Sequence, residues 1–231
     1  MVVYVNGCSH TEDIDKNDTT NTWPRILMAK LSKMYGYYRV IGHSLNNRID
    51  NTMSNFDKIK DDILINDSVC GASNDYIFHT SLESINKLLS NNIKPDIIVI
   101  QWSGPNRREN CDHNGNISFI TPYENVDDHL KFEPMASKHT LHYMFSLQEI
   151  LIKNGINYLF FNYMGLDDSI KKTNILEKID KTKVLDFGNN TVFNGLIELF
   201  KSKQYNRDIQ GHPNEKGANF ISNKIIEKLF I

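Results

Sequence analysis

The residues best suited to chemistry are a serine near the start of the chain and a histidine near its end. Ser9 lies in the stretch NGCSHT, just after a short apolar run. A serine hydroxyl becomes a nucleophile only when a base removes its proton. His212, in RDIQGHPNEKG, carries the side chain best suited to act as that base near neutral pH. Asp208, four residues upstream, could hold the imidazole in the required tautomer.

Two further residues could stabilise the oxyanion that forms when such a serine attacks an ester. Gly71, in NDSVCGASND, could present its backbone N–H with no side chain in the way, and Asn106, in WSGPNRR, could present its amide. Donors aimed at a developing oxyanion are often the largest catalytic term. Taken singly, these residues are equally well explained as a loop serine, a helix-start histidine, a turn glycine and a loop asparagine. Only their joint placement indicates a reaction.

The elements that must position these residues follow from the apolar pattern. We expect strands at 2–6, 63–66, 97–100 and 158–162, with further candidates at 38–44 and 117–120. We expect helices at 22–36, 76–89 and 137–153 and after Pro213, and weaker ones near 169–179 and 192–201. Strands alternating with helices predict an α/β fold, a mostly parallel sheet with helices on both faces. Ligands bind such sheets at the carboxyl ends of the strands.

Composition narrows the class of protein. The 231 residues fit a single domain over 1–231, with a long loop insertion around 103–136. A net charge of -2 and scattered basic residues argue against nucleic-acid or membrane partners. The start of the chain lacks the features of a signal peptide, and no apolar stretch is long enough to span a bilayer. Three cysteines favour a reducing compartment, so we expect a cytoplasmic protein, or one carried in a virion.

Four short blocks resemble the motif blocks of the SGNH (GDSL-like) hydrolase family. The letters GCS at 7–9 fill the GDS-like block, and Asn66 and Gly71 keep the family's spacing of an Asn and a Gly five residues later. The block Gly-x-Asn-Asp corresponds to the region after residue 100, and HP at 212–213 fills the block before the last helix. The resemblance runs from residue 3 to about residue 225.

The family pattern is altered at three places. Cys8 stands where the family has Asp. Asn106 falls one residue later than the family's Asn, so that Ser103 or Asn74 could take its role. Asp208 precedes the histidine by four residues, where the family has three, so either a bulged loop brings it close or a backbone carbonyl orients the ring.

The resemblance implies a flavodoxin-like three-layer sandwich and a set of roles. Ser9 would be the nucleophile, His212 the base, and Gly71 and Asn106 oxyanion donors beside the Ser9 N–H. Arg107, in a W-S-x-x-x-R stretch similar to that of phage-encoded members, would belong to the substrate-binding residues.

The expected activity is that of a serine esterase acting on a small acyl ester, such as an acetyl ester of a carbohydrate, without metal or cofactor. The substrate class comes from the resemblance alone. Two alternatives stay open: a catalytically inactive binding or structural module, for example in a viral particle, and acyl transfer to an acceptor other than water. The oligomeric state is not predicted.

Two other chemistries are less favoured by the pattern. His139 and His142 share a helix face and, with His129, could be imagined around a metal, but no HExxH pattern is present. Cys8 could replace Ser9 as the nucleophile, although His10 is its only basic neighbour, which gives little reason for a lowered thiol pKa.

Overall fold

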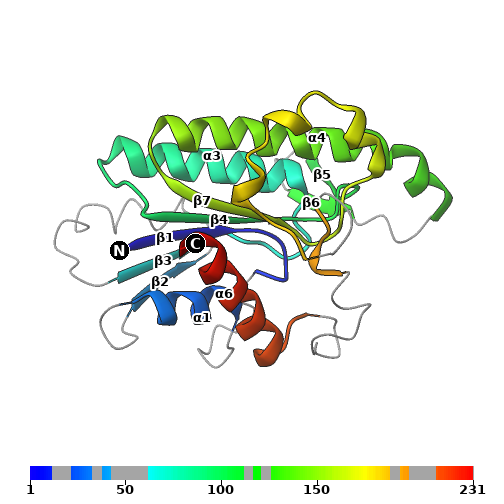
Figure 1. The fold of residues 1–231 in the computed structure, drawn as a ribbon. Helices are drawn as coiled ribbons and strands as arrows, with labels where there is room; N and C mark the ends of the chain where they lie inside the picture. The colour runs from blue at the N-terminus through cyan, green and yellow to red at the C-terminus, as the bar shows by residue number, and fades with distance from the viewer. Residues whose placement is uncertain are drawn as a thin grey trace.

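The centre of the computed structural model is a parallel sheet with the strand order β2-β3-β1-β4-β7-β8 (Figure 1). The structure describes residues 1–11, 22–32, 38–42, 62–111, 117–120, 126–187, 193–197 and 212–230. The strands are β1 (Val2–Asn6), β2 (Tyr38–Gly42), β3 (Asp62–Asn66), β4 (Ile97–Trp102), β7 (Asn157–Asn162) and β8 (Val184–Leu185). All five pairings between neighbours in this order are parallel.

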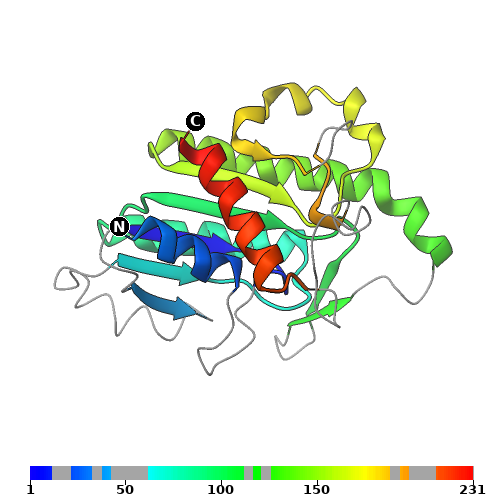
Figure 2. The same ribbon diagram turned by 60° about the horizontal axis from the view of Figure 1, so that its bottom comes forward.

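Helices cover both faces of this sheet, as Figures 1 and 2 show from two directions. Helices α3 (Asn74–Ser90) and α4 (Val126–Lys153) lie on one face, and α1 (Trp23–Leu31) and α6 (Glu215–Phe230) on the other. Successive strand residues point to opposite faces, so Tyr4 packs in the core with α3 and α4 while Val3 and Val5 pack in the core with α1 and α6. The expected α/β class, with helices on both faces of a parallel sheet, is confirmed.

The central strand β4 is buried on both of its faces. All six residues of IIVIQW are buried, and β1 and β7 flank this strand on either side. A continuous apolar run of β-branched residues is typical of a parallel strand that has helices on both faces. The prediction of this strand from the sequence is therefore confirmed, with its end extended to Trp102.

The segment around 103–136 is more regular than the expected long loop. A two-stranded antiparallel hairpin pairs β5 (Arg108–Cys111) with β6 (Ile117–Ile120), and α4 already begins at Val126. The sequence predicted a strand at 117–120 but not its partner. The predicted start of α4 at 137 was wrong because Pro134, which usually ends a helix, lies inside this one.

Other predicted boundaries also need correction. The stretch 169–179 is not one helix: short 3-10 turns at Asp168–Lys172 and Leu176–Lys178 are separated by an extended Thr173. Helix α1 ends at Leu31 instead of at residue 36, and Thr22 precedes it without a capping side-chain hydrogen bond. Most of the weak helix expected at 192–201, and Asp208, lie outside the described residues.

The order of the strands indicates where a ligand of this sheet is expected to bind. After β1 the chain builds β2 and β3 on one side of β1, then crosses to build β4, β7 and β8 on the other side. Ligands of such sheets bind at the carboxyl ends of the strands, at this point of reversal. The segments following β1 and β4 flank that point. Within the described part of the chain, no helix combines the length and the apolar character needed to cross a membrane.

Candidate active site

The segment after β1 is a tight turn that holds Ser9 and His10 at its centre. The backbone N–H of Thr11 donates to the carbonyl of Cys8 over 2.8 Å, which closes a four-residue turn. A Cβ added to Gly7 would lie 2.5 Å from Thr11 Oγ1, so only glycine lets the turn fold back this closely. Ser9 and His10 are each only 7% exposed as a result. Cys8 is completely buried, and its Sγ accepts a hydrogen bond from Gln101.

The loop after β3 ties this turn down. Asn66 Nδ2 donates to the carbonyl of Thr11 over 3.1 Å, and the N–H of Val69 donates to the carbonyl of Gly7 over 3.2 Å. Gly71 follows with a φ of +79°, a left-handed conformation that residues other than glycine rarely adopt. The spacing of Asn66 and Gly71 therefore has a structural reason: the first residue anchors the turn, and the second bends the loop beside it.

The segment after β4 is held by hydrogen bonds from the side chain of Asn74, at the start of α3. The N–H of Ser103 donates to Asn74 Oδ1 over 2.7 Å, and Asn74 Nδ2 donates to the Ser103 carbonyl and to Thr140 Oγ1 over 3.3 Å and 2.9 Å. These contacts use both amide protons of Asn74, which is buried. Asn74 therefore brackets the backbone at Ser103.

A second turn follows directly and carries Asn106 and Arg107. The N–H of Arg107 donates to the carbonyl of Gly104 over 3.1 Å, with Pro105 and Asn106 at the two central positions. Arg107 Nη1 donates back to Ser103 Oγ over 2.9 Å, and Asn106 and Arg107 are half-buried. Asn106 thus lies in a compact turn in which proline occupies a favoured position.

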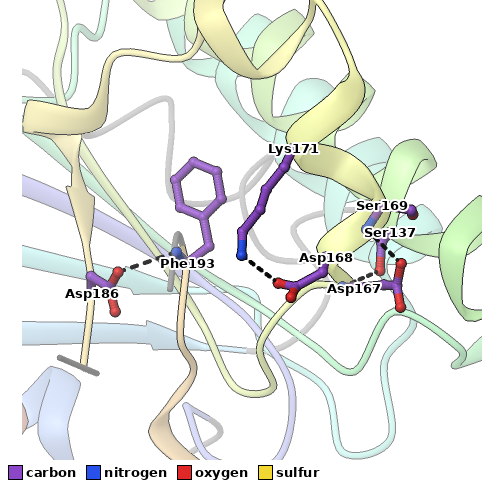
Figure 3. A network of polar contacts seen from close by, with 7 residues as sticks. All are labelled: Ser137, Asp167, Asp168, Ser169, Lys171, Asp186 and Phe193. Carbon is purple, nitrogen blue, oxygen red and sulfur yellow. Dashed lines mark hydrogen bonds and ion pairs between the residues drawn. The ribbon is translucent and has the colours of Figure 1, made fainter. Parts of the chain in front are cut away.

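Tyr163, the residue after β7, is in backbone contact with the later segment 193–197. Its N–H donates to the carbonyl of Trp102, and its own carbonyl accepts from the N–H of Ile197. A Cβ on Gly195 would collide with the Tyr163 backbone, so glycine permits this close approach. Asp186 anchors the start of this segment by accepting a hydrogen bond from the Phe193 N–H over 3.2 Å (Figure 3).

The loop that continues from Tyr163 is anchored on α4, as Figure 3 shows. Ser137 Oγ accepts a hydrogen bond from the Asp167 N–H over 3.0 Å, and Asp167 in turn accepts one from the Ser169 N–H over 2.8 Å. Lys171 and Asp168 form an ion pair of 2.9 Å on the exposed side. The loop after β7 is therefore tied to α4 at Asp167, four residues after Tyr163.

Three aromatic rings bring the ends of the chain together at this edge of the sheet. The ring of His10 stacks on Tyr163 with centroids 4.0 Å apart, and its centroid lies 4.9 Å from that of His212. His212 precedes α6, whose first turn begins with Asn214 Oδ1 accepting from the Gly217 N–H. The expected meeting of the turn after β1 with the segment before the last helix is confirmed.

The electrostatic character of this cluster is positive. Burial is the main cause that lowers the pKa of His10 to about 3, and electrostatic interaction with His212 and Arg107 lowers it further. His10 is therefore neutral at physiological pH. Arg107 extends over Tyr163, with its guanidinium carbon 5.9 Å from the ring centroid. Among the residues that the structure describes, no group of three His, Cys, Asp or Glu could hold a metal ion.

The structure brings three of the predicted site residues into neighbouring segments and does not describe Asp208. Ser9, Arg107 and His212 belong to segments joined by the contacts of His10 and Tyr163. Asp208 lies outside the described residues, and so do the side chains of 126–133, which include His129. The catalytic roles of Ser9 and His212, and the oxyanion roles of Gly71 and Asn106, stay predictions.

Sequence reasoning missed His10 and Tyr163 as members of this cluster. His10 was considered only as a neighbour of Cys8. Tyr163 directly follows a predicted core strand, which is the position where residues of an open α/β sheet meet a ligand. That rule, applied to each strand end, could have identified Tyr163; the stacking of His10 on it has no sequence signal.

Comparison with known proteins adds information on the fold. No protein-family model and no curated protein matches the sequence. The crystal structure of an acetyl xylan esterase, AlAXEase, aligns over 100% of both chains with 16% sequence identity and a TM-score of 0.50. A Bacteroides fragilis protein assigned as an acylhydrolase aligns over 99% of this chain and 86% of its own, with 14% identity and a TM-score of 0.43. The likeness to AlAXEase is one of fold.

Proposed function

We propose that this protein is a serine-dependent ester hydrolase in which Ser9 is the nucleophile and His212 the base. The observation that carries the proposal is the contact between the Ser9–His10 turn and His212 at the carboxyl edge of the sheet. The two segments are separated by about 200 residues of sequence, yet the rings of His10 and His212 meet, with centroids 4.9 Å apart. The turn that carries Ser9 and His10 follows β1, at the carboxyl ends of the strands where ligands of such sheets bind. A fold similar to that of an acetyl xylan esterase supports the same class of reaction.

The proposed reaction has two steps. Ser9 Oγ attacks the ester carbonyl while its proton passes to His212, and the alcohol leaves with that proton. Water then attacks the acyl-enzyme with His212 again as the base, releasing the acid and restoring the serine hydroxyl. Asp208 would orient the His212 ring. The substrate we propose is a small acyl ester, such as an acetyl ester of a carbohydrate.

The tetrahedral intermediates need donors for their negative oxygen. We assign this role to the N–H groups of Ser9 and Gly71 and to the Asn106 side chain. Asn74 has both amide protons engaged with Ser103 and Thr140, so we assign it the positioning of the Ser103–Arg107 segment instead. His10 stacks on Tyr163 beside Ser9, and its lowered pKa of about 3 makes it too weak a base to compete with His212 for the serine proton.

The proposal is tested by measuring 4-nitrophenyl acetate hydrolysis and labelling by a fluorophosphonate, which forms a phosphorus–oxygen bond to an activated serine and releases fluoride. We expect Ser9→Ala to lose roughly 1,000-fold or more in kcat/KM and to escape labelling. His212→Asn should slow both reactions. The matched control is Ser90→Ala, since Ser90 lies exposed at the far end of α3 and its side chain bonds only the Lys87 carbonyl and the adjacent Asn91 side chain.

Three results would contradict the proposal. Hydrolysis that persists in Ser9→Ala would assign the nucleophile elsewhere. Labelling of a residue other than Ser9, located by mass spectrometry, would do the same. A wild-type protein that is folded, inert to both reagents and equally inert after each substitution would favour the inactive binding or structural module.

A further inference from the structure

Arg107 is a cation without a carboxylate partner among the residues that the structure describes. Its Nη1 donates to Ser103 Oγ over 2.9 Å, and its guanidinium lies over the Tyr163 ring. A guanidinium offers five N–H donors, so one hydrogen bond leaves most of its capacity for a ligand. Elsewhere in the described chain, Lys171 and Lys224 lie on the surface in ion pairs of 2.9 Å and 2.7 Å. Arg107 is half-buried, and its charge is not balanced in this way.

The position of Arg107 relative to the proposed nucleophile follows from a chain of ring contacts. The guanidinium carbon is 5.9 Å from the Tyr163 centroid, Tyr163 stacks on His10 at 4.0 Å, and His10 directly follows Ser9 in the turn. The charge of Arg107 is close enough to contribute to the lowered pKa of His10. Arg107 therefore lies near enough to Ser9 for a single small substrate to contact both residues.

The support beneath Arg107 is stiff. Asn74 holds both the N–H and the carbonyl of Ser103, at 2.7 Å and 3.3 Å, and the turn from Gly104 to Arg107 is closed by a hydrogen bond of 3.1 Å. A guanidinium held in one place has little conformational entropy to lose on binding. Its planar arrangement of donors matches the two oxygens of a carboxylate.

We propose that Arg107 is a specificity-determining residue that binds a carboxylate on the alcohol part of the ester substrate. This inference rests on the proposed function and adds to it the charge of the substrate. The carboxylate belongs to the alcohol part because a small acyl group such as acetyl carries no charge. The natural substrate would then be a small acyl ester of an acidic alcohol, for example of a sugar that bears a carboxylate.

Two acetyl esters that differ in one charge test this inference. 4-Acetoxybenzoate carries a carboxylate, and 4-acetoxybenzamide is a neutral compound of nearly the same shape. The measured quantity is the ratio of their kcat/KM values in each variant, since intrinsic differences in reactivity cancel when ratios are compared. We expect Arg107→Gln to lower the anionic-to-neutral ratio roughly tenfold to a hundredfold. Arg107→Lys should restore part of the ratio because the charge returns without the planar fork.

The matched control is Arg108→Gln, which removes the same charge one residue later from an exposed side chain. It should leave the ratio as in the wild type. If Arg107 served only to hold Ser103 and Tyr163, its loss would slow both esters equally. An Arg107→Gln ratio equal to that of the wild type would therefore overturn the inference while leaving the proposed function intact.

A binding measurement separates this inference from the proposed function. The product 4-hydroxybenzoate and its neutral analogue 4-hydroxybenzamide are titrated into the wild type and Arg107→Gln by calorimetry or NMR. Preferential binding of 4-hydroxybenzoate that is lost in Arg107→Gln supports the carboxylate site even if neither ester is hydrolysed, a result that would refute only the hydrolase. Equal affinity of the wild type for both products would contradict the carboxylate site.

Discussion

Two polar clusters begin from the same strand, β1, and differ in the kind of contact that joins their side chains. Beneath α3, Asn6 Nδ2 donates to Thr80 Oγ1 and Ser81 Oγ over 2.8 Å and 2.9 Å, and Asn6 Oδ1 accepts from the Gly7 N–H. Asp67 accepts from Tyr4 over 3.0 Å and from Ser84 over 2.5 Å. We call this group of Tyr4, Asn6, Asp67, Ser81 and Ser84 the α3 network.

The second group, which we call the edge cluster, consists of His10, Arg107, Tyr163 and His212. Its members are joined by ring stacking and by a cation over a ring, and Arg107 has one side-chain hydrogen bond, to Ser103. Buried polar groups that hydrogen-bond to one another stabilise and specify a structure. The Arg107 guanidinium has five N–H donors and one side-chain hydrogen bond, so it keeps capacity for a ligand. We therefore expect the α3 network to stabilise the fold and the edge cluster, through Arg107, to take part in function.

The largest effect is expected from Asp67→Asn in the α3 network. Burial raises the pKa of Asp67 to about 6 from 3.8, while the hydrogen bonds from Ser84 and Tyr4 lower it. The folded protein thus binds this proton more tightly than the unfolded chain does. Its contribution to stability is complete below about pH 4 and is lost as pH rises through about 6. Because asparagine does not ionise, the variant should have a higher free energy of unfolding at about pH 8, by up to about 3 kcal/mol.

Urea denaturation at about pH 4 and about pH 8 measures this effect. Asp168→Asn, at an exposed carboxylate, is the control and should show no such gain. If Asp67→Asn instead abolished ester hydrolysis without unfolding the protein, the α3 network would be functional and the contrast between the two clusters would disappear.

Gly7→Ala should affect the edge cluster through its geometry. The added methyl would come within 2.5 Å of Thr11 Oγ1 and 3.0 Å of Gln101 Cβ, so the turn that carries Ser9 and His10 must move. We expect a loss of about 2 kcal/mol in stability and, under the proposed function, roughly 100-fold in kcat/KM. Gly165→Ala is the matched control, since its new methyl would meet no atom closer than 3.6 Å. Equal behaviour of the two variants would show that the turn tolerates displacement.

Replacing His10 tests the electrostatics of the edge cluster. The folded-state pKa of about 3 lies below the ordinary value of 6.5, so the unfolded chain binds a proton here more readily than the folded protein. The stability contribution is complete above about pH 6.5 and is lost progressively as pH falls toward about 3. At about pH 5 the wild type should have lost up to about 2 kcal/mol through this residue.

His10→Gln and His10→Phe should both lack this acid-dependent loss in thermal or urea denaturation. The phenylalanine variant keeps a ring to stack on Tyr163, so comparing the two separates stacking from titration. If the loss of stability at acid pH were the same in both variants as in the wild type, the pKa of His10 would not be lowered in the folded protein.

The smallest effect is expected from Gly71→Ala, because it alters one backbone position. The φ of +79° at Gly71 should make the substitution cost about 1 kcal/mol. Gly155, between α4 and β7, has a φ of +61° and provides a matched control with similar strain away from the edge cluster. Under the proposed function only Gly71→Ala also lowers kcat/KM. Equal activity of the two variants would argue against Gly71 as an oxyanion donor.

The sequence predicted the frame of this protein better than its details. The runs VVYVN and IIVI were correctly predicted as buried strands, and the alternation with amphipathic helices indicated a parallel sheet. The start of α4 was predicted eleven residues too late, and Pro134, a residue that the local rule excludes from helix interiors, lies inside this helix. The strand at Arg108–Cys111 was missed because a polar sequence, RENC, pairs only through its partner in the hairpin.

The sequence by itself determined which residue types follow each strand, and therefore that Ser9 would stand at an edge where ligands bind. Only the tertiary structure decided their neighbours: His10 stacks on Tyr163 and faces His212, and Arg107 folds back onto Ser103. The physical reason is that strand and helix periodicity depends on neighbours in sequence. Contacts between side chains about 150 and 200 residues apart depend on the order of the strands and on the glycines that let loops approach.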